Sequence, residues 1–159
     1  CMCCRCGGVP YGTRRREEKS GRSDGCAELG KVNSGTTAFV DAGSYHMEAW
    51  AEVYVRSGLR GLISASTMDE KGLPASIAQN ADEAVAQTDR LYDAYDGRGN
   101  LKVAYSLRSL ISCSDELNMK AAERAKERGA KLQAHMHEYA GEVNYFLANK
   151  RTRALEDLD

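Results

Sequence analysis

The chain has 159 residues, a formal net charge of −1 at pH 7, and 42% hydrophobic residues including six cysteines. This length allows one domain with a hydrophobic core, and the near-neutral charge argues against a nucleic-acid partner or a membrane-surface role. No apolar run approaches the ~18–20 residues needed to span a bilayer, and the start lacks the apolar segment of a signal peptide. We therefore expect a cytoplasmic protein.

Residues 1–26 differ in composition from the rest of the chain. They contain five of the six cysteines, and six basic residues stand against three acidic ones. The crowded cysteines of the opening CMCCRC could form a thiolate metal site, but structural zinc sites usually bring paired cysteines from two separate places. We interpret residues 1–26 as a disordered or non-native leader and residues 27–159 as the folded domain. A metal-binding leader is the alternative.

Strand and helix patterns alternate from residue 27 onward. In chain order we predict a strand at 36–41, a helix from Ser44 to Gly58, a strand at 59–65, a helix from Asn80 to near Gly97, a strand at 101–107, a helix from Ser112 or Ser114 to Gly129, a strand at 131–136 and a helix at 142–155. The strands are short runs of β-branched and apolar residues. Each helix repeats apolar residues every three or four positions, and Asn80 with Glu83 is typical of a capping box.

Such an alternation with short links indicates a parallel sheet with crossover helices. A complete (β/α)8 barrel, the TIM barrel, needs roughly 250 residues, and this chain of 159 is well short of that. The fold class is therefore α/β. Periodicity leaves two architectures open, a small open sheet or a partial barrel of about four β/α units.

The segment from Gln133 to Glu138 combines residue types used for metal binding and for proton transfer. Alternate strand residues point to the same face, so Gln133, His135 and His137 are expected to line the interior, with Glu138 beginning the loop. Parallel α/β folds place their sites at this carboxyl end of the strands. Neutral imidazole is the commonest metal ligand, and a carboxylate near a metal can move protons. The alternative is a pair of surface histidines without a ligand.

Three other polar residues follow predicted strands. Arg108 could grip an anionic or heteroaromatic substrate, or pair with a carboxylate. Asp41 is either a helix cap or a site carboxylate, and His46 is either an exposed helix residue or part of the site. Neither a glycine-rich phosphate loop nor a G-x-S-x-G nucleophile elbow occurs in the sequence.

Four segments in order resemble motifs of one enzyme family. Residues 34–41 (SGTTAFVD) resemble a second strand SGTT-x-F-x-D, 57–60 (SGLR) a third-strand entry SG-[IL]-R, 107–117 (LRSLISCSDEL) a fourth strand with its helix cap, and 132–138 (LQAHMHE) a fifth strand L-H-x-H-x-x-E. The family is the amidohydrolase superfamily, in its branch of aminohydrolases and chlorohydrolases acting on nitrogen heterocycles. The resemblance covers about residues 27–159.

The resemblance implies a metal-dependent hydrolase of C–N bonds other than peptide bonds, which deaminates a heterocycle such as a purine, pterin or triazine in a (β/α)8 barrel. His135 would be a ligand of one zinc or iron ion, and Glu138 would be the catalytic proton shuttle. Arg108, Gln133 and His137 would contact the substrate. Gln133 stands where the family carries a substrate-contacting histidine.

The chain also departs from the family pattern. No H-x-H pair precedes the first predicted strand, and the ligands of later strands would follow Asp159. Catalytic zinc needs about three protein ligands, so we expect an internal fragment that is inactive alone. Its open sheet edges favour association into a homo-oligomer. A small non-catalytic α/β module with a metal-binding leader, and the product of a non-functional gene fragment, are the alternatives.

Overall fold

Strands and helices alternate along the chain as predicted. The computed structural model describes residues 33–70, 74, 77–153 and 156. Their elements are β1 (Ala38–Val40), α2 (Met47–Ser57), β2 (Arg60–Ile63), α3 (Ala81–Tyr95), β3 (Leu101–Leu107), α4 (Asp115–Arg128), β4 (Lys131–Ala134) and α5 (Ala140–Asn149). The leader predicted at residues 1–26 lies outside the described residues.

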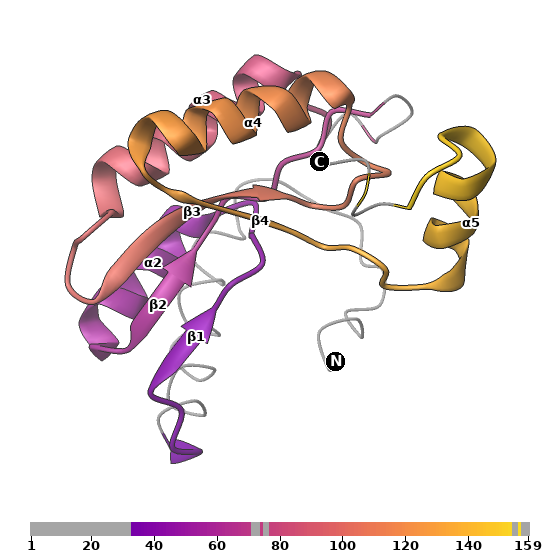
Figure 1. Ribbon diagram of the computed structural model, residues 1–159. Helices are drawn as coiled ribbons and strands as arrows, with labels where there is room; N and C mark the ends of the chain where they lie inside the picture. Colours follow the sequence, from indigo (N-terminus) through magenta and orange to yellow (C-terminus); the bar gives the residue numbers. More distant parts are fainter. Residues whose placement is uncertain (1–32, 71–73, 75–76, 154–155, 157–159) are drawn as a thin grey trace.

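The four strands of the described residues form one parallel sheet in the order β1-β2-β3-β4. The connecting helices α3 and α4 pack against β3 and against each other. They lie on one face of the sheet, which curls away from them toward β1 (Figure 1). Helices outside a curled parallel sheet are the arrangement found in β/α barrels.

Strand β3 has the predicted bounds, whereas its neighbours are shorter than predicted. The first three residues of β3 pair with β2, and its last four pair with β4. Each neighbour therefore pairs with only half of β3, which is the stagger that closing strands into a barrel requires. The predicted strands at 36–41, 59–65 and 131–136 shorten to Ala38–Val40, Arg60–Ile63 and Lys131–Ala134.

Side-chain and glycine caps set four of the eight ends of the helices α2 to α5. Asn80 and Glu83 form the predicted capping box, with each side chain accepting the other's backbone N–H at 2.8 and 3.1 Å. Ser114, rather than Ser112, caps α4. Gly58 and Gly129 adopt the left-handed conformation that ends α2 and α4. No helix within the described ranges is both long and apolar enough to cross a membrane.

Two helix predictions were wrong at their ends. Helix α2 begins at Met47 after His46, without a side-chain cap. Ser44 instead forms a parallel bridge with Ala65, because the β1–β2 ladder continues beyond both strands. Helix α5 covers Ala140–Asn149 rather than 142–155. It ends there because Arg151 has a φ of 57°, which a right-handed helix cannot contain.

Two hydrophobic clusters fill the space between sheet and helices. One lies among α2, α3 and the strands β2 and β3. The other joins the end of β3 to α4 and α5, and its residues Leu107, Leu117 and Phe146 have no exposed surface. Ala134 and Met136 pack against this second cluster. It therefore anchors the chain on both sides of His135.

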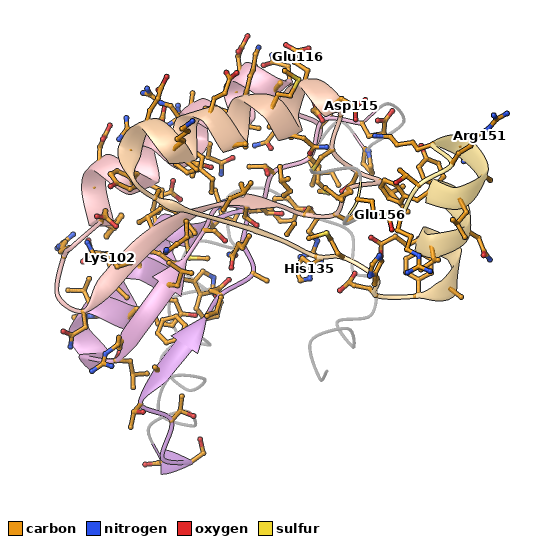
Figure 2. All side chains as sticks on the ribbon, viewed as in Figure 1. Lys102, Asp115, Glu116, His135, Arg151 and Glu156 are labelled. Atoms are coloured by element: carbon orange, nitrogen blue, oxygen red, sulfur yellow. The ribbon has the colours of Figure 1, made fainter. Side chains whose placement is uncertain are left out.

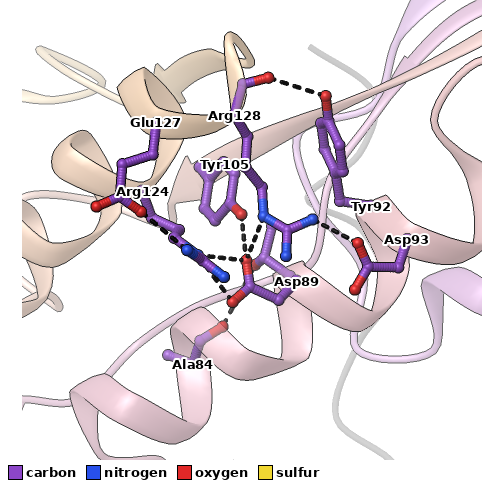
Figure 3. A network of polar contacts seen from close by, with 9 residues as sticks. Ala84, Asp89, Tyr92, Asp93, Tyr105, Arg124, Glu127 and Arg128 are labelled. Carbon is purple, nitrogen blue, oxygen red and sulfur yellow. Dashed lines mark hydrogen bonds and ion pairs between the residues drawn. The ribbon is translucent and has the colours of Figure 1, made fainter.

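A network of ion pairs and hydrogen bonds joins α3 to α4 on the outer face (Figure 3). Asp89 accepts hydrogen bonds from Arg124 Nε at 3.1 Å and from the Tyr105 hydroxyl. Arg128 Nε lies 3.2 Å from the same carboxylate, and Arg128 also pairs with Asp93. Tyr105 comes from β3, so this network ties the helix layer to the sheet.

Candidate functional site

Polar side chains from three strands meet inside the curl of the sheet. Gln133 Nε2 donates to the Asp41 backbone oxygen at 2.8 Å and to Ser64 Oγ at 2.6 Å. Ser106 Oγ donates to the Ala42 oxygen at 3.2 Å. In sheet order β4 and β1 are separated by two strands. Only a curled sheet lets a β4 side chain reach the end of β1, so these bonds mark the concave, interior face.

The strand does not continue through the predicted metal and acid–base residues. β4 ends at Ala134, and His137 adopts a left-handed φ of 56°, which is uncommon outside glycine. The prediction that His137 shares the interior strand face with Gln133 and His135 was therefore wrong. His135 lies below the strand layer, on the side opposite Glu116 of α4 (Figure 2). His137 is exposed.

The turn brings the His135 imidazole and the Glu138 carboxylate together. His135 Nδ1 lies 3.2 Å from Glu138 Oε1, and 55% of the Glu138 side chain is exposed. A carboxylate in contact with one ring nitrogen leaves the other nitrogen as the candidate metal ligand. The predicted metal ligand and the predicted proton shuttle are thus in contact.

The second ring nitrogen of His135 fits a metal ligand. His135 Nε2 is buried and has no hydrogen-bond partner among the residues that the structure describes, although buried polar atoms are normally paired. A cavity of about 40 Å³ adjoins it, lined by Ala42, Ser106, Gln133, Ala134 and His135. That volume admits a water molecule or an ion. Among the residues that the structure describes, no three His, Cys, Asp or Glu gather to hold a metal, so this imidazole is one ligand rather than a complete site.

The predicted substrate contacts occupy different positions relative to this cavity. Gln133 lines it, but both of its amide hydrogens are used in the interior bonds. A contact between Gln133 and a substrate therefore falls to its Oε1 atom. Arg108 is exposed at the end of β3, and no carboxylate of the described residues forms an ion pair with it.

Asp41 and His46 have structural surroundings at the end of β1. Asp41 Oδ1 accepts the Gly43 N–H at 3.0 Å, and Oδ2 accepts the Tyr54 hydroxyl at 3.1 Å. Asp41 therefore holds its own loop against α2 rather than capping that helix. His46 is exposed at the start of α2.

Sequence reasoning missed two carboxylates near the strand ends. Asp69 accepts hydrogen bonds from Ser114 N at 2.7 Å and Ser114 Oγ at 2.5 Å, which joins the loops after β2 and β3. Cys113 beside it is buried and donates to the Thr67 oxygen, as expected of a packed thiol. Glu142 is 1% exposed in α5. Its spacing of four residues from apolar Phe146, on one helix face, was the available signal.

Comparison with known proteins gives a consistent family and fold. The amidohydrolase family model matches residues 26–158. A 5'-deoxyadenosine deaminase of Methanopyrus kandleri is 28% identical over 94% of this chain and 34% of its own length. The structure of a guanine deaminase from C. acetobutylicum with bound guanine superposes with a TM-score of 0.80 at 18% identity, over 89% of this chain and 35% of that one.

A second solved structure carries a metal. An adenosine deaminase from Xanthomonas campestris with bound zinc superposes with a TM-score of 0.77 at 24% identity, over 90% of this chain and 32% of that one. The chain spans about a third of the length of each of these proteins. The likeness confirms the α/β fold as a partial TIM barrel and removes the small open sheet as the alternative.

Proposed function

Because the chain belongs to the amidohydrolase family, we propose that it forms the second to fifth β/α units of a hydrolase that deaminates a nitrogen heterocycle. The observation that carries the proposal is the His135 imidazole, with Nε2 buried and unpartnered and Nδ1 3.2 Å from Glu138. Relatives named as deaminases of adenosine-type and guanine substrates support the reaction and the substrate class.

His135 Nε2 is the ligand that this chain offers to one divalent metal, either zinc or iron. When bound there, a metal would lower the pKa of a coordinated water toward neutrality, and this would make the water a better nucleophile toward the ring carbon that bears the amino group. The remaining ligands come from outside the described residues. The zinc in the adenosine deaminase structure supports a divalent metal in this family.

Glu138 is the residue proposed to move protons. Its carboxylate is half exposed beside His135, so it is accessible to both water and substrate. It would take one proton of the attacking water and deliver it to the ring nitrogen. The second proton of that water would then pass to the amino group, the bond from the ring carbon to the amino nitrogen would break, and ammonia would leave. The contact with His135 holds this carboxylate beside the proposed metal position, so the proton transfer stays within hydrogen-bond reach.

Arg108, Gln133 and His137 are the proposed substrate contacts. Arg108 presents a planar guanidinium that suits a heteroaromatic ring or an anionic group, and Gln133 offers its Oε1 atom from the cavity wall. His137 stays a prediction from an exposed turn position. The zinc–iron choice, a cytoplasmic location and a homo-oligomer also stay predictions.

Metal binding tests the role of His135 directly. Cobalt(II) added to the isotope-labelled chain is expected to broaden the His135 ring signals at low occupancy, because one imidazole binds a metal weakly. His46→Gln serves as the matched control and is expected to leave this broadening unchanged. Equal broadening of His46 and His135 would refute a preferred ligand at His135.

Activity tests the fragment proposal. The 159-residue chain alone is expected to release no ammonia from adenosine, guanine or triazine substrates and to bind no stoichiometric zinc tightly, because it supplies one ligand where about three are needed. The full coding sequence is expected to carry an H-x-H strand and to deaminate one of these rings. Glu138→Gln in it is expected to lower kcat by about 10²–10⁴-fold. Tight zinc and turnover with the 159-residue chain would contradict the proposal.

A further inference from the structure

Glu142 is the one charged residue in the buried set of the described chain, and the proposed reaction does not use it. Its side chain is 1% exposed in the first turn of α5, which follows the turn that contains His135 and Glu138. A buried carboxylate is unfavourable unless hydrogen bonds compensate for its lost hydration. The hydrogen bonds of its two carboxylate oxygens therefore decide how unfavourable its burial is.

One oxygen of Glu142 holds the backbone of Glu138. Oε2 accepts the Glu138 N–H at 2.9 Å, while Oε1 is buried without a partner among the described residues. In an ordinary capping box the third helical residue accepts the N–H of the N-cap residue. Here the N-cap is Tyr139, and Glu142 reaches one residue further back, out of the helix.

The bond falls where the backbone needs support. His137 is left-handed immediately before Glu138, and this conformation disfavours residues that carry a Cβ. A charge-assisted hydrogen bond to the next N–H stabilises the turn, and the N-terminus of α5 favours the negative charge of Glu142. The same turn sets the 3.2 Å contact between Glu138 and His135.

We propose that Glu142 is a positioning residue, whose carboxylate fixes the Glu138 backbone so that the Glu138 side chain stays directed at His135. This inference rests on the proposed function, which makes Glu138 the proton shuttle. No hydrogen bond or ion pair of the described residues joins Glu142 to His135, and Glu142 does not line the cavity beside it. It acts only through the conformation of the turn.

Two spectroscopic signals of the labelled chain test the proposal. Glu142→Ala is expected to raise the hydrogen-exchange rate of the Glu138 amide at least about 10-fold, because its acceptor is lost. The same variant is expected to remove the ring-nitrogen signature of the His135–Glu138 contact. Glu142→Gln is expected to restore both signals largely, since its amide oxygen can accept the same N–H.

Asn118→Ala is the matched control for a purely structural role. Asn118 is also a buried polar residue whose side-chain oxygen has no partner among the described residues, but it lies in α4 and not in the turn. Its loss is expected to lower stability and leave both signals unchanged. Unchanged signals in Glu142→Ala, or equal changes in Asn118→Ala, would overturn the proposal.

A variant that fails to fold can be distinguished from a failure of the proposed function. If Glu142→Ala does not fold, Glu142→Gln carries the test, because a neutral acceptor must shift the Glu138 amide proton upfield from its position in the unmodified chain. An unmoved amide proton then overturns the proposal. Neither signal needs a metal or a substrate, so failure of the proposed function would appear in the cobalt and ammonia measurements instead.

Discussion

The outer helix layer and the turn after β4 differ in whether their polar groups have hydrogen-bond or ion-pair partners. On the outer face, Asp89 is surrounded by Arg124, Arg128 and Tyr105, and its carboxylate bonds to all three (Figure 3). In the turn and at the start of α5, His135 Nε2 and Glu142 Oε1 are buried and have no partner within the described part of the chain. Two of the three unpartnered buried side-chain atoms of the described residues thus belong to His135 and Glu142.

This difference separates polar groups that are fully paired from buried groups that keep one atom without a partner among the described residues. Paired charges satisfy one another and contribute to stability, whereas an unpaired buried atom lowers stability unless something binds to it. Buried polar atoms without a partner are therefore a better guide to the candidate site than paired charges are. The outer network has more charges than the turn, and these charges pair with one another.

The largest expected effect concerns the packing beneath the turn. Phe146→Ala removes a ring with no exposed surface from the second cluster, and we expect a loss of about 3–5 kcal/mol in unfolding free energy. Urea denaturation measures it. Leu147→Ala, at a neighbouring residue that is 50% exposed, is expected to change stability by less than about 0.5 kcal/mol. Similar losses for both would show that α5 is not anchored through Phe146.

The outer network predicts the next largest effect. Asp89→Asn removes the charge that Arg124 and Arg128 share, and we expect a loss of about 1–3 kcal/mol in urea unfolding. Asp93→Asn is the control, because Asp93 is 65% exposed and pairs with Arg128 alone. Its expected loss is about 0–1 kcal/mol. An equal loss of unfolding free energy in the two variants would show that Asp89 contributes no more to stability than Asp93 does.

Acid should weaken the outer network through Asp89. Partial burial raises the pKa of Asp89, but the hydrogen bonds from Arg124 and Tyr105 outweigh it and hold the pKa below its ordinary value of 3.8. The unfolded chain therefore binds this proton first. The stability from Asp89 is complete above about pH 4 and is lost as the pH falls through the folded-state pKa. The urea midpoint should fall more steeply below pH 4 in the unmodified chain than in Asp89→Asn.

The smallest expected effect is in the site itself. Glu138→Gln replaces a carboxylate that is 55% exposed and pairs with a single imidazole. We expect a change of less than about 0.5 kcal/mol in the unfolding free energy of the chain. A loss above about 1.5 kcal/mol would place Glu138 with the stabilising residues and contradict the contrast between the two regions.

Local patterns in the sequence predicted the fold class and most element positions. The run 101–107 is β3 to the residue, and the capping box at Asn80 begins α3 where expected. Such features depend on neighbours three or four residues apart, which a single sequence displays. The motif order also indicated the family, because four short segments matched in sequence.

Tertiary structure alone decided how long the other strands are and where the site residues point. β4 stops at Ala134 because β3 offers it only four residues to pair with, so His137 lies in the turn beyond the strand. The bonds from Gln133 to the end of β1 join chain segments that only folding brings together, whereas the bond from Glu142 to the Glu138 backbone spans four residues across the turn after β4. The spacing of apolar residues and the helix or strand propensity of each segment determine which elements form. Pairing across the curled sheet determines which side chains meet.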